Sequence, residues 1–335
     1  MKRSILSLMY LIQGMRDAGI DLNDKLMRIG LQVDAIEPNA ILDEKLEYEI
    51  LKVLCEDLSA EQGLTIGTHY TLAGYGPLLM LLVSSHNIGF ALNKAIEYCR
   101  LTHLSGQLNK QHIQNQVAIL YKPLNLQSEN GRFLAQCEIA GTFKFLQNLY
   151  AMMGLPFPHI RVELPFETPK NPMDMDIYQK IYGTDVCFNA LDARFWLNDQ
   201  LLLVNIPSSN EETFFIYEKK CRDELLRLSV MENRPRIVQR VIDYLILQNT
   251  IVPTMTETSQ ALNMPERTLR HQLRQHQTSY KKIREEIIKE KALKMMEYKK
   301  YSIEMIAELL GYSEPSAFNH AFKRWFGQSP RQYLK

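Results

Sequence analysis

The amino-acid sequence predicts a mixed α/β N-terminal domain followed by an all-α C-terminal domain with two helix-turn-helix units. A length of 335 residues is enough for two domains with separate cores. After Arg234-Pro235 the apolar pattern is helical throughout, whereas strand-like alternation occurs before it. Charge divides at the same point. Residues 234–335 carry 18 Lys and Arg against 10 Asp and Glu, a net of +8, and the rest carries 21 against 28, a net of −7. This charge asymmetry predicts that the C-terminal domain binds a polyanion and that the N-terminal domain does not. The alternative is chance clustering of surface charges.

The first part of the N-terminal domain is predicted to be helical. Apolar content of 46% and charged content of 23% are ordinary for a globular protein. Helical spacing occurs twice within residues 4–60, on either side of a turn with Pro38 and Asn39. A loop at 74–77 precedes an apolar segment, and residues 93–104 form a further predicted helix. The two helical faces within 4–60 consist of Ile5, Leu8, Met9, Ile12 and Met15, and of Leu46, Ile50, Val53, Leu54 and Leu58.

Strand-like alternation follows in two segments, 117–121 and 133–139. Between them lies Asn130-Gly131, a strong turn signal, so we predict an antiparallel hairpin. Residues 1–205 are therefore expected to form a mixed α/β domain. The further elements predicted in it are helices at 141–153 and 174–182 and strands at 159–164, 186–188 and 193–197.

Residues 206–233 are predicted to be an amphipathic helical linker to a C-terminal domain at 234–335. Its apolar stripe can pack on the N-terminal domain or pair with a second copy of the chain, and both alternatives stay open. The stripe consists of Phe214, Tyr217, Cys221, Leu225 and Leu228.

Metal, cofactor and membrane functions find no support in the sequence. The five cysteines are scattered without a CxxC motif, and the eight histidines have no paired ligand spacing. The 74–77 segment lacks the Gly or Lys of a phosphate loop. The apolar run 78–83 is too short to cross a membrane, and residues 5–15 resemble an amphipathic helix more than a signal peptide. We expect a cytoplasmic protein that binds no metal, cofactor or membrane.

The segment 302–327 has the pattern of a helix-turn-helix unit. Gly311 supplies the backbone freedom for a sharp turn. Ser313 or Glu314 is placed to cap the second helix, and Pro315 suits its first turn. That helix is expected to bury Phe318, Phe322 and Phe326 on one face and to expose Ser316, Asn319, His320 and Lys323 on another.

A second unit of this kind lies upstream, at about 254–276. Thr254 or Thr256 is placed to cap its first helix, and its second helix is predicted at 266–275. Leu262 stands 48 residues before Leu310, and Leu269 stands 49 residues before Phe318, so the extra residue falls in the turn. An ordinary helical bundle with solvated faces is the alternative, but the same polar stripe occurs twice in a basic region. Held by a helix at 279–298, two such units would reach two successive major grooves of double-stranded DNA, about 34 Å apart. The upstream stripe consists of Arg267, Arg270, His271 and Arg274.

The polar side chains divide into two classes of DNA contact. Guanidinium, imidazole, amide and hydroxyl groups can hydrogen-bond to base edges, whereas cations that meet phosphates set affinity and salt dependence. We predict that Trp325 and Phe326 belong to the core. Base contacts are predicted for Arg267, Arg270, His271, Ser316, Asn319 and His320, and phosphate contacts for Arg274, Lys323, Arg324 and Arg331.

These motifs resemble the DNA-binding signature of AraC/XylS-type transcription regulators. The resemblance is carried by 303–307, 311–313, 317–325, Gly327 and 329–331, and by Arg267-Thr268-Leu269 upstream. Residues 1–205 resemble the arabinose-binding-type N-terminal domain of one branch of the family at 74–79, 91–92 and 182–188. The resemblance implies a regulator, commonly an activator and often a homodimer, whose N-terminal domain senses a small-molecule effector or dimerises. RNA polymerase is a candidate partner. Two departures are Asn263 where the family usually has Gly and Pro265 where it usually has Ser.

The effector site is the least visible part of the sequence. Arg161 and Arg194 are candidates to bind a carboxylate ligand, although structural roles for both are the alternative. A regulator whose N-terminal domain only dimerises remains a second possibility. An enzyme fused to a DNA-binding module is a third, but it would need an activated or zinc-held cysteine, and the five single cysteines argue against it. We therefore expect a regulator and not an enzyme.

Overall fold

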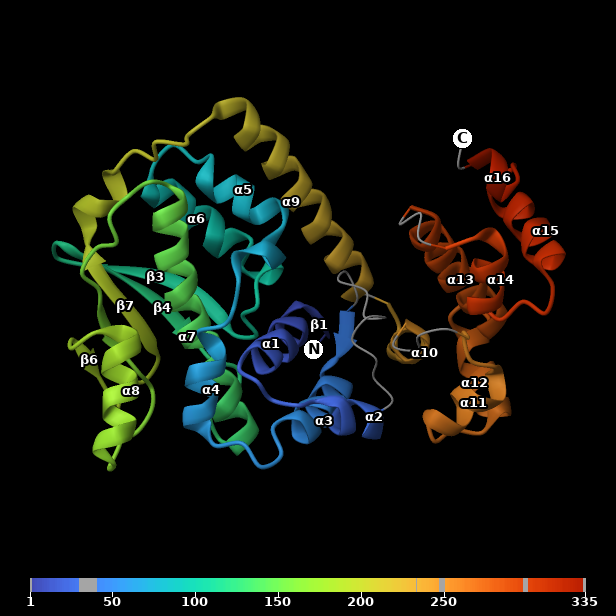
Figure 1. Ribbon diagram of the computed structural model, residues 1–335, viewed down its shortest axis with the longest axis horizontal. Helices are drawn as coiled ribbons and strands as arrows, with labels where there is room; N and C mark the ends of the chain where they lie inside the picture. The colour runs from blue at the N-terminus through green and yellow to red at the C-terminus, as the bar shows by residue number, and fades with distance from the viewer. Residues whose placement is uncertain (1, 30–40, 233, 247–250, 298–300, 334–335) are drawn as a thin grey trace. The chain divides into compact units, whose positions relative to one another are not determined.

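A computed structural model describes residues 2–29, 41–232, 234–246, 251–297 and 301–333 (Figure 1). The chain divides into two compact units. The N-terminal unit comprises Lys2–Lys25 and Glu44–Val230, and the C-terminal unit comprises Met231–Lys335 together with Leu26–Asp43. The mixed α/β character of the first and the helical character of the second confirm the predicted fold class.

The N-terminal unit is built on a five-stranded sheet in the order β3-β4-β7-β5-β6. β5 and β6 are parallel, and the other neighbouring pairs are antiparallel. The tight turn between β3 and β4 is made by Gln114, which has φ 54°, and Asn115. The strands are β3 (Gln107–Ile113), β4 (Gln116–Lys122), β5 (Arg161–Glu163), β6 (Val186–Cys187) and β7 (Ala193–Asn198).

The predicted strand at 133–139 and the predicted hairpin at Asn130-Gly131 are wrong. Both lie in α7 (Glu129–Met152), one 24-residue helix that also contains the predicted helix at 141–153. Ser128 caps it by accepting a hydrogen bond from the N–H of Gly131 at 3.1 Å, so Asn-Gly marks a helix start here. Residues 133–143 are all buried, and a helix buried on every side loses the amphipathic period that would distinguish it from a strand.

The predicted helices within 4–60 and at 174–182 and the predicted strands at 117–121, 159–164, 186–188 and 193–197 are confirmed as elements, whereas β1, β2 and β3 were not predicted. α6 differs, because Asn87 caps it five residues earlier than predicted and a 3₁₀ turn replaces its predicted end. The predicted turn with Pro38 and Asn39 lies outside the described residues. The elements are β1 (Lys2–Ser4), α1 (Leu6–Asp17), α2 (Asn23–Arg28), β2 (Ile41–Asp43), α3 (Glu44–Leu54), α4 (Ala60–Gly67), η2 (Leu72–Tyr75), α5 (Pro77–Val83), α6 (Ile88–Glu97), η3 (Cys99–Leu101), α8 (Pro172–Tyr182), η4 (Asp199–Leu203) and α9 (Glu211–Glu232).

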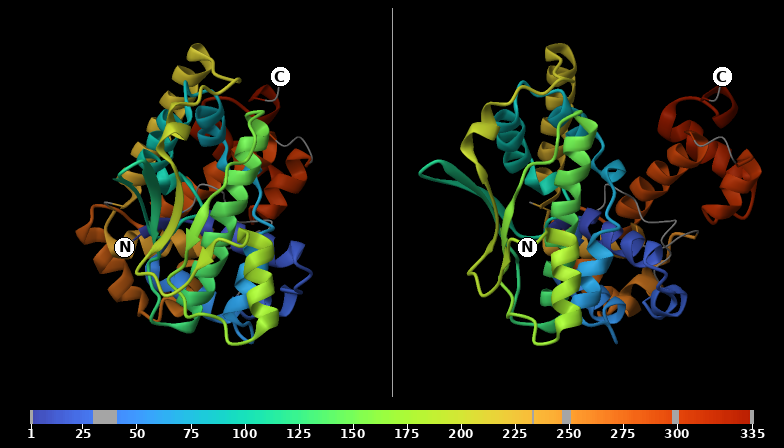
Figure 2. Two further views of the ribbon diagram at one scale, coloured as in Figure 1. Left: turned by 90° about the vertical axis from the view of Figure 1, so that its left-hand side faces the viewer. Right: turned by 60° about the vertical axis from the view of Figure 1, so that its left-hand side comes forward.

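The core of the N-terminal unit lies between the sheet and helices α6 and α7, which Figure 2 shows on the same face of the sheet. α4 packs on α7 at very short range, because Gly63 and Gly67 face α7. A Cβ at Gly67 would lie 2.4 Å from the carbonyl oxygen of Cys137, and one at Gly63 would lie 2.7 Å from that of Phe133. Only glycine permits this approach of the two backbones.

A buried polar cluster joins α7 to the segment before β3. The Glu138 carboxylate accepts hydrogen bonds from the N–H of Ser105 at 2.8 Å and from the hydroxyl of Tyr121. Next to it, His103 contacts the Tyr75 hydroxyl through Nδ1 and the Glu138 carbonyl through Nε2 at 3.1 Å. Burial lowers the pKa of His103 to about 4, so the imidazole is neutral near pH 7.

α9 packs on α6 through Phe214, whose ring lies 5.3 Å from that of Phe90, and Glu218 pairs with Lys94 of α6 at 2.6 Å. Cys221 and Leu228 of α9 are also buried. The segment 204–210 before α9 is tied to the α5–α6 turn by four hydrogen bonds. They join the N–H of Ile88 to Val204 O (3.1 Å), the N–H of Ile206 to His86 O (3.2 Å), the N–H of Asn210 to Ser84 O (3.1 Å), and Ser208 Oγ to Val83 O (2.6 Å). We call this segment the strap.

The C-terminal unit is organised around α10, whose Val241 and Leu245 are fully buried. α10 contacts α11, α12 and α13, while α13 contacts α14, and α14 contacts α15. The predicted helix at 266–275 is confirmed at both ends, and α16 was not predicted. The helices are α10 (Arg236–Ile246), α11 (Met255–Ala261), α12 (Glu266–Gln275), α13 (Tyr280–Glu297), α14 (Ile303–Leu309), α15 (Pro315–Phe326) and α16 (Pro330–Tyr333).

Candidate nucleic-acid interface and ligand groove

The two predicted helix-turn-helix units have the same turn. α11 and α14 each end with two backbone hydrogen bonds that close around a residue with a left-handed backbone. That residue is Asn263 (φ 49°) in the first unit and Gly311 (φ 81°) in the second. Asparagine thus adopts the conformation for which glycine is usual. The bonds, 2.9–3.0 Å long, run from the N–H groups of Asn263, Met264, Gly311 and Tyr312 to the carbonyls of Gln260, Ser259, Glu308 and Ala307 respectively.

α12 and α15, the second helices of the two units, are the recognition helices. Each buries one face completely: Leu269 and Leu273 in α12, Phe318 and Phe322 in α15. These pairs occupy the positions predicted from the 49-residue offset. Neither helix has a side-chain cap, since Pro265 and Glu314 at the N-cap positions make no capping hydrogen bond. The opposite faces expose Arg267, Arg270, His271 and Arg274 in α12, and Ser316, Asn319, His320 and Lys323 in α15.

Within α12 the polar groups are partly organised by neighbours. Arg270 pairs with Glu266, one turn earlier, at 3.4 Å. The same Glu266 carboxylate accepts a hydrogen bond from Thr256 Oγ1 at 2.6 Å, which ties the start of α12 to α11. His271 lies 3.3 Å from the side-chain amide nitrogen of Gln275. Arg270 is thereby oriented before any ligand binds, although it remains exposed.

The end of α15 is held by Glu285 of α13. Its carboxylate accepts hydrogen bonds from Trp325 Nε1 at 2.6 Å and from Arg324 Nη2 at 2.7 Å. These bonds, the Trp325 one first, hold the pKa of Glu285 below its ordinary value. Trp325 and Phe326 are half-buried and not fully in the core. Arg324 and Arg331 are exposed, with Arg331 on α16.

α13 also holds the first unit. The Arg284 guanidinium donates to the carbonyls of Val252, at 3.0 Å, and of Pro253, at 3.1 Å, just before α11. Tyr280 donates to the same Pro253 carbonyl at 2.5 Å and contacts Thr258 Oγ1 at 3.0 Å. At the start of α11, Thr254 and Glu257 form the capping box, which confirms one of the two predicted capping residues.

Sequence reasoning missed Glu266, Arg284 and Glu285. Glu266 stands four residues before Arg270 in a helix, a spacing that predicts an ion pair. Arg284 and Glu285 carry no local signal, because their partners lie about 30 to 40 residues away in the chain.

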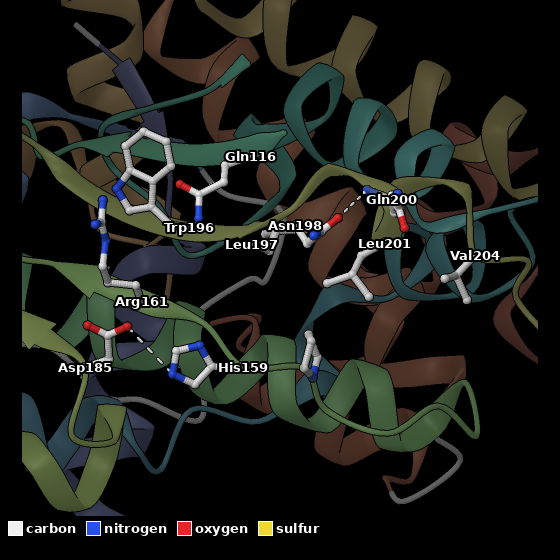
Figure 3. A pocket seen from close by; sticks show the side chains of 11 residues that line it. Gln116, His159, Arg161, Asp185, Trp196, Leu197, Asn198, Gln200, Leu201 and Val204 are labelled. Carbon is white, nitrogen blue, oxygen red and sulfur yellow. Dashed lines mark hydrogen bonds and ion pairs between the residues drawn. The ribbon is translucent and has the colours of Figure 1, made fainter. Parts of the chain in front are cut away.

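In the N-terminal unit, a groove of about 690 Å³ lies at one end of the sheet (Figure 3). This volume is within the range of small-molecule sites. Figure 3 shows Arg161 beside Trp196, with His159 and Asp185 below them. Arg161 and Trp196 are paired across β5 and β7, and the guanidinium carbon lies 5.2 Å from the centre of the indole ring. The groove is also lined by Gln116, Pro158, Leu197, Asn198, Gln200, Leu201 and Val204.

The structure separates the two candidate effector residues. Arg161 lines the groove, and Arg194 does not. Both pair with Glu163, which accepts from Arg161 at 2.8 Å and from Arg194 at 3.4 Å. Among the aromatic residues of 182–196, Trp196 lines the groove, while Tyr182 and Phe195 belong to the core. The register of three strands creates this arrangement, so a single-sequence pattern could not reveal it.

All five cysteines are free thiols. Burial raises the pKa of Cys55 to about 12 and that of Cys99 to about 11, which is the reverse of an activated nucleophile. In the part of the chain that the structure describes, no His, Cys, Asp or Glu cluster is arranged to hold a metal ion. No described helix has the length and apolar character needed to span a bilayer.

Two helix-turn-helix units with a shared connecting helix, joined to an α/β domain, define a transcription regulator with a DNA-binding domain. Family models agree: residues 258–335 match a helix-turn-helix domain, and residues 19–205 match the arabinose-binding N-terminal domain of AraC transcription regulators. Since the second match covers more than half of the chain, the protein belongs to the AraC-type transcription regulators.

Curated relatives are regulators of the same type. The HTH-type transcriptional regulator VqsM of Pseudomonas aeruginosa is 24% identical over 290 residues, covering 84% of this chain and 86% of the relative. The ornithine utilization regulator of the same organism is 24% identical over 296 residues, covering 86% and 83%. Among solved structures, the transcriptional regulator CdpR from Pseudomonas aeruginosa aligns with a TM-score of 0.47 and 20% identity over 98% of both chains.

Proposed function

We propose that this regulator binds double-stranded DNA by placing α12 and α15 in two successive major grooves, and that it activates transcription in response to a small-molecule effector. The observation that carries the DNA-binding mode is the repetition of one geometry. Both units have the same turn, bury their apolar residues at equivalent positions, and expose a polar face on the recognition helix. A helix of this kind fits the major groove.

The exposed side chains divide by chemistry into base and phosphate contacts. Arg270 is the best-supported base contact, because Glu266 orients it and a guanidinium can bind guanine O6 and N7 together. Arg324 is partly engaged by Glu285, so its phosphate contact would compete with that ion pair. The proposed base contacts remain Arg267, Arg270, His271, Ser316, Asn319 and His320, and the proposed phosphate contacts remain Arg274, Lys323, Arg324 and Arg331.

A binding-site selection with the full chain tests this mode. We expect two conserved sequence blocks whose centres lie about 10 base pairs apart, as two successive major grooves require. A single block, with no change in the selected sequence on replacing Asn319 by Ala, would show that α15 does not enter a groove. Gln328→Ala is the matched control, because Gln328 is exposed just after α15 and is not among the proposed DNA contacts, and it should leave the selected sequence unchanged.

The effector site proposed here is the groove at the end of the sheet, with Arg161 as the group that binds an anionic part of the ligand. Volume, the accessible guanidinium and the polar lining support this assignment. One relative is named an ornithine utilization regulator, so amino acids belong in the first set of ligands to screen.

Ligand screening by thermal shift on the full chain tests the groove. An effector should raise the unfolding temperature, since it binds only the folded protein. Arg161→Ala should abolish that shift. Arg194→Ala is the control, because Arg194 shares the Glu163 partner but does not line the groove. Equal losses in both variants would indicate a structural role for the pair, and no hit in a broad library would favour an N-terminal domain that only dimerises.

The functional division that we propose follows the sequence: residues 1–205 sense an effector or dimerise, 206–233 form a helical linker, and 234–335 bind DNA in the cytoplasm.

A homodimer is supported by α9, where Phe215, Ile216 and Leu226 are 58%, 55% and 65% exposed. Phe215 and Ile216 are adjacent on α9, and a contiguous exposed apolar patch is typical of a contact surface. Phe215→Asp should shift the protein to a monomer in sedimentation. RNA polymerase is the partner that activation would require.

A further inference from the structure

An apolar cavity of about 60 Å³ lies inside the N-terminal unit. It is bounded by α6, α7, the inner face of β4 and β7, and η4. Its wall contains aliphatic and aromatic side chains, among them Ala91, Leu149 and Leu197, and no charged group. It is separate from the ligand groove, although Leu197 contributes to both.

The size and the wall of this cavity select the chemistry of an occupant. A water molecule takes up about 30 Å³ in the liquid and needs two to four polar partners, which these side chains do not supply. An apolar group, in contrast, would gain dispersion contacts on every side. Two or three aliphatic carbons, or one xenon atom, are on the scale of this volume. Ala95, Leu146 and Leu202 of the wall are partly exposed, so the cavity has a route to solvent.

The cavity adjoins the strap that leads into α9. Leu82 and Ile88, which both line it, stand at the two ends of the α5–α6 turn. That turn supplies His86 O and Ser84 O to the N–H groups of Ile206 and Asn210 in the strap. An occupant that tightens the packing of Leu82 and Ile88 would therefore reduce the opening of these hydrogen bonds.

We propose that this cavity binds a small uncharged alkyl group of a ligand, and that its occupation stabilises the strap at the start of α9. A regulatory role for the strap rests on the proposed effector response, whereas binding of an alkyl group in the cavity does not depend on that proposal. The groove assigned to an anionic group is separate, so either site can be tested without the other.

Xenon is the probe, observed by ¹²⁹Xe NMR with the full chain. We expect saturable binding to the wild type and at least a roughly tenfold weaker affinity in Ala91→Val, whose added methyl groups fill the void. Ala151→Val is the matched control: Ala151 lies on α7 close to the cavity in the chain, but it is exposed and does not line the cavity. As a second variant, Leu149→Ala enlarges the cavity and should admit benzene, seen as a higher unfolding temperature.

Amide hydrogen exchange supplies the second readout. Xenon should slow exchange at Ile206 and Asn210 several-fold in the wild type but not in Ala91→Val. Absence of saturable xenon binding, or equal binding in Ala91→Val, would overturn the site. Binding without slower exchange at these two amides would overturn its coupling to the strap. None of these outcomes would affect the proposed DNA contacts or the Arg161 groove, which the operator and thermal-shift experiments test.

Discussion

Arg284 and Glu285, neighbours on α13, bind different helix-turn-helix units. Arg284 holds the carbonyls of Val252 and Pro253 before α11, and Glu285 holds Trp325 and Arg324 near the end of α15. The side chains of successive residues on a helix point about 100° apart, so Arg284 and Glu285 in one turn of α13 can contact different units. The orientation of the second recognition helix relative to the first therefore depends on this short part of the connecting helix.

Glu285→Ala is expected to destabilise the C-terminal unit by about 1–2 kcal/mol, because it removes two hydrogen bonds to a charged acceptor that is itself partly exposed. Glu286→Ala is the control, since Glu286 is exposed and makes a single pair with Lys289 at 3.6 Å. It should change stability by less than about 0.5 kcal/mol. Urea unfolding of the full chain measures both. Similar values for the two variants would refute the role assigned to Glu285.

The contribution of Glu285 should depend on pH in a defined direction. Hydrogen bonds from Trp325 and then Arg324 lower the folded-state pKa below the ordinary value of 4.5. Stability from this group is thus fully present above that ordinary value and is lost as pH falls through the folded-state pKa. The difference in unfolding free energy between wild type and Glu285→Gln should stay constant from about pH 7 to about pH 5.5 and shrink below about pH 4.5. A difference that grows in acid would contradict the assignment.

Arg270→Ala should relax sequence preference at one or two base pairs and weaken operator binding by about 1–3 kcal/mol. Arg274→Ala should instead weaken binding to all sequences alike and lower the salt dependence by about one phosphate contact. Binding across single-base operator variants at several salt concentrations separates the two effects. If Arg270→Ala caused only a uniform loss, Arg270 would be a phosphate contact.

His103 should make the N-terminal unit sensitive to mild acid. Its folded-state pKa is about 4, against 6.5 when unfolded, because burial opposes the charged imidazole. A depressed pKa means that the stability contributed by neutral His103 is complete above pH 6.5 and is lost as pH falls towards 4, by about 3 kcal/mol in total. His103→Gln should remove this slope. An unchanged slope would assign the acid sensitivity to another group.

Gly67→Ala should destabilise the N-terminal unit by about 1–3 kcal/mol or more, since the new Cβ would lie 2.4 Å from the Cys137 carbonyl oxygen. Thr65→Ala, on the exposed side of the same helix, should be neutral or slightly stabilising. Thermal unfolding followed by near-ultraviolet dichroism compares them. A neutral Gly67→Ala would mean that α4 can move away from α7 at little cost.

Local signals explain what the sequence could predict. α12 has both ends marked, by Pro265 before it and by the end of its apolar spacing after Leu273, and both ends are where expected. The predicted strand at 133–139 is wrong because residues 133–143 of α7 are buried on every side and show no amphipathic helical period. The groove around Arg161 and the contacts of Glu285 depend on residues distant in the chain, brought together by sheet register and helix packing.

The two units differ in the spacing between turn and recognition helix, and this difference has a consequence for engineering. The turn hydrogen bonds repeat at an offset of 48 residues, whereas the buried positions of α12 and α15 repeat at 49, so the units differ by one residue between turn and recognition helix. Each turn and the recognition helix after it therefore form one unit, in which the length of the turn sets the rotation of the recognition helix relative to α11 or α14. A hybrid protein with altered operator specificity should exchange segments that begin at Asn263 and Gly311. Each recognition helix then keeps the turn of the length that precedes it in the native chain.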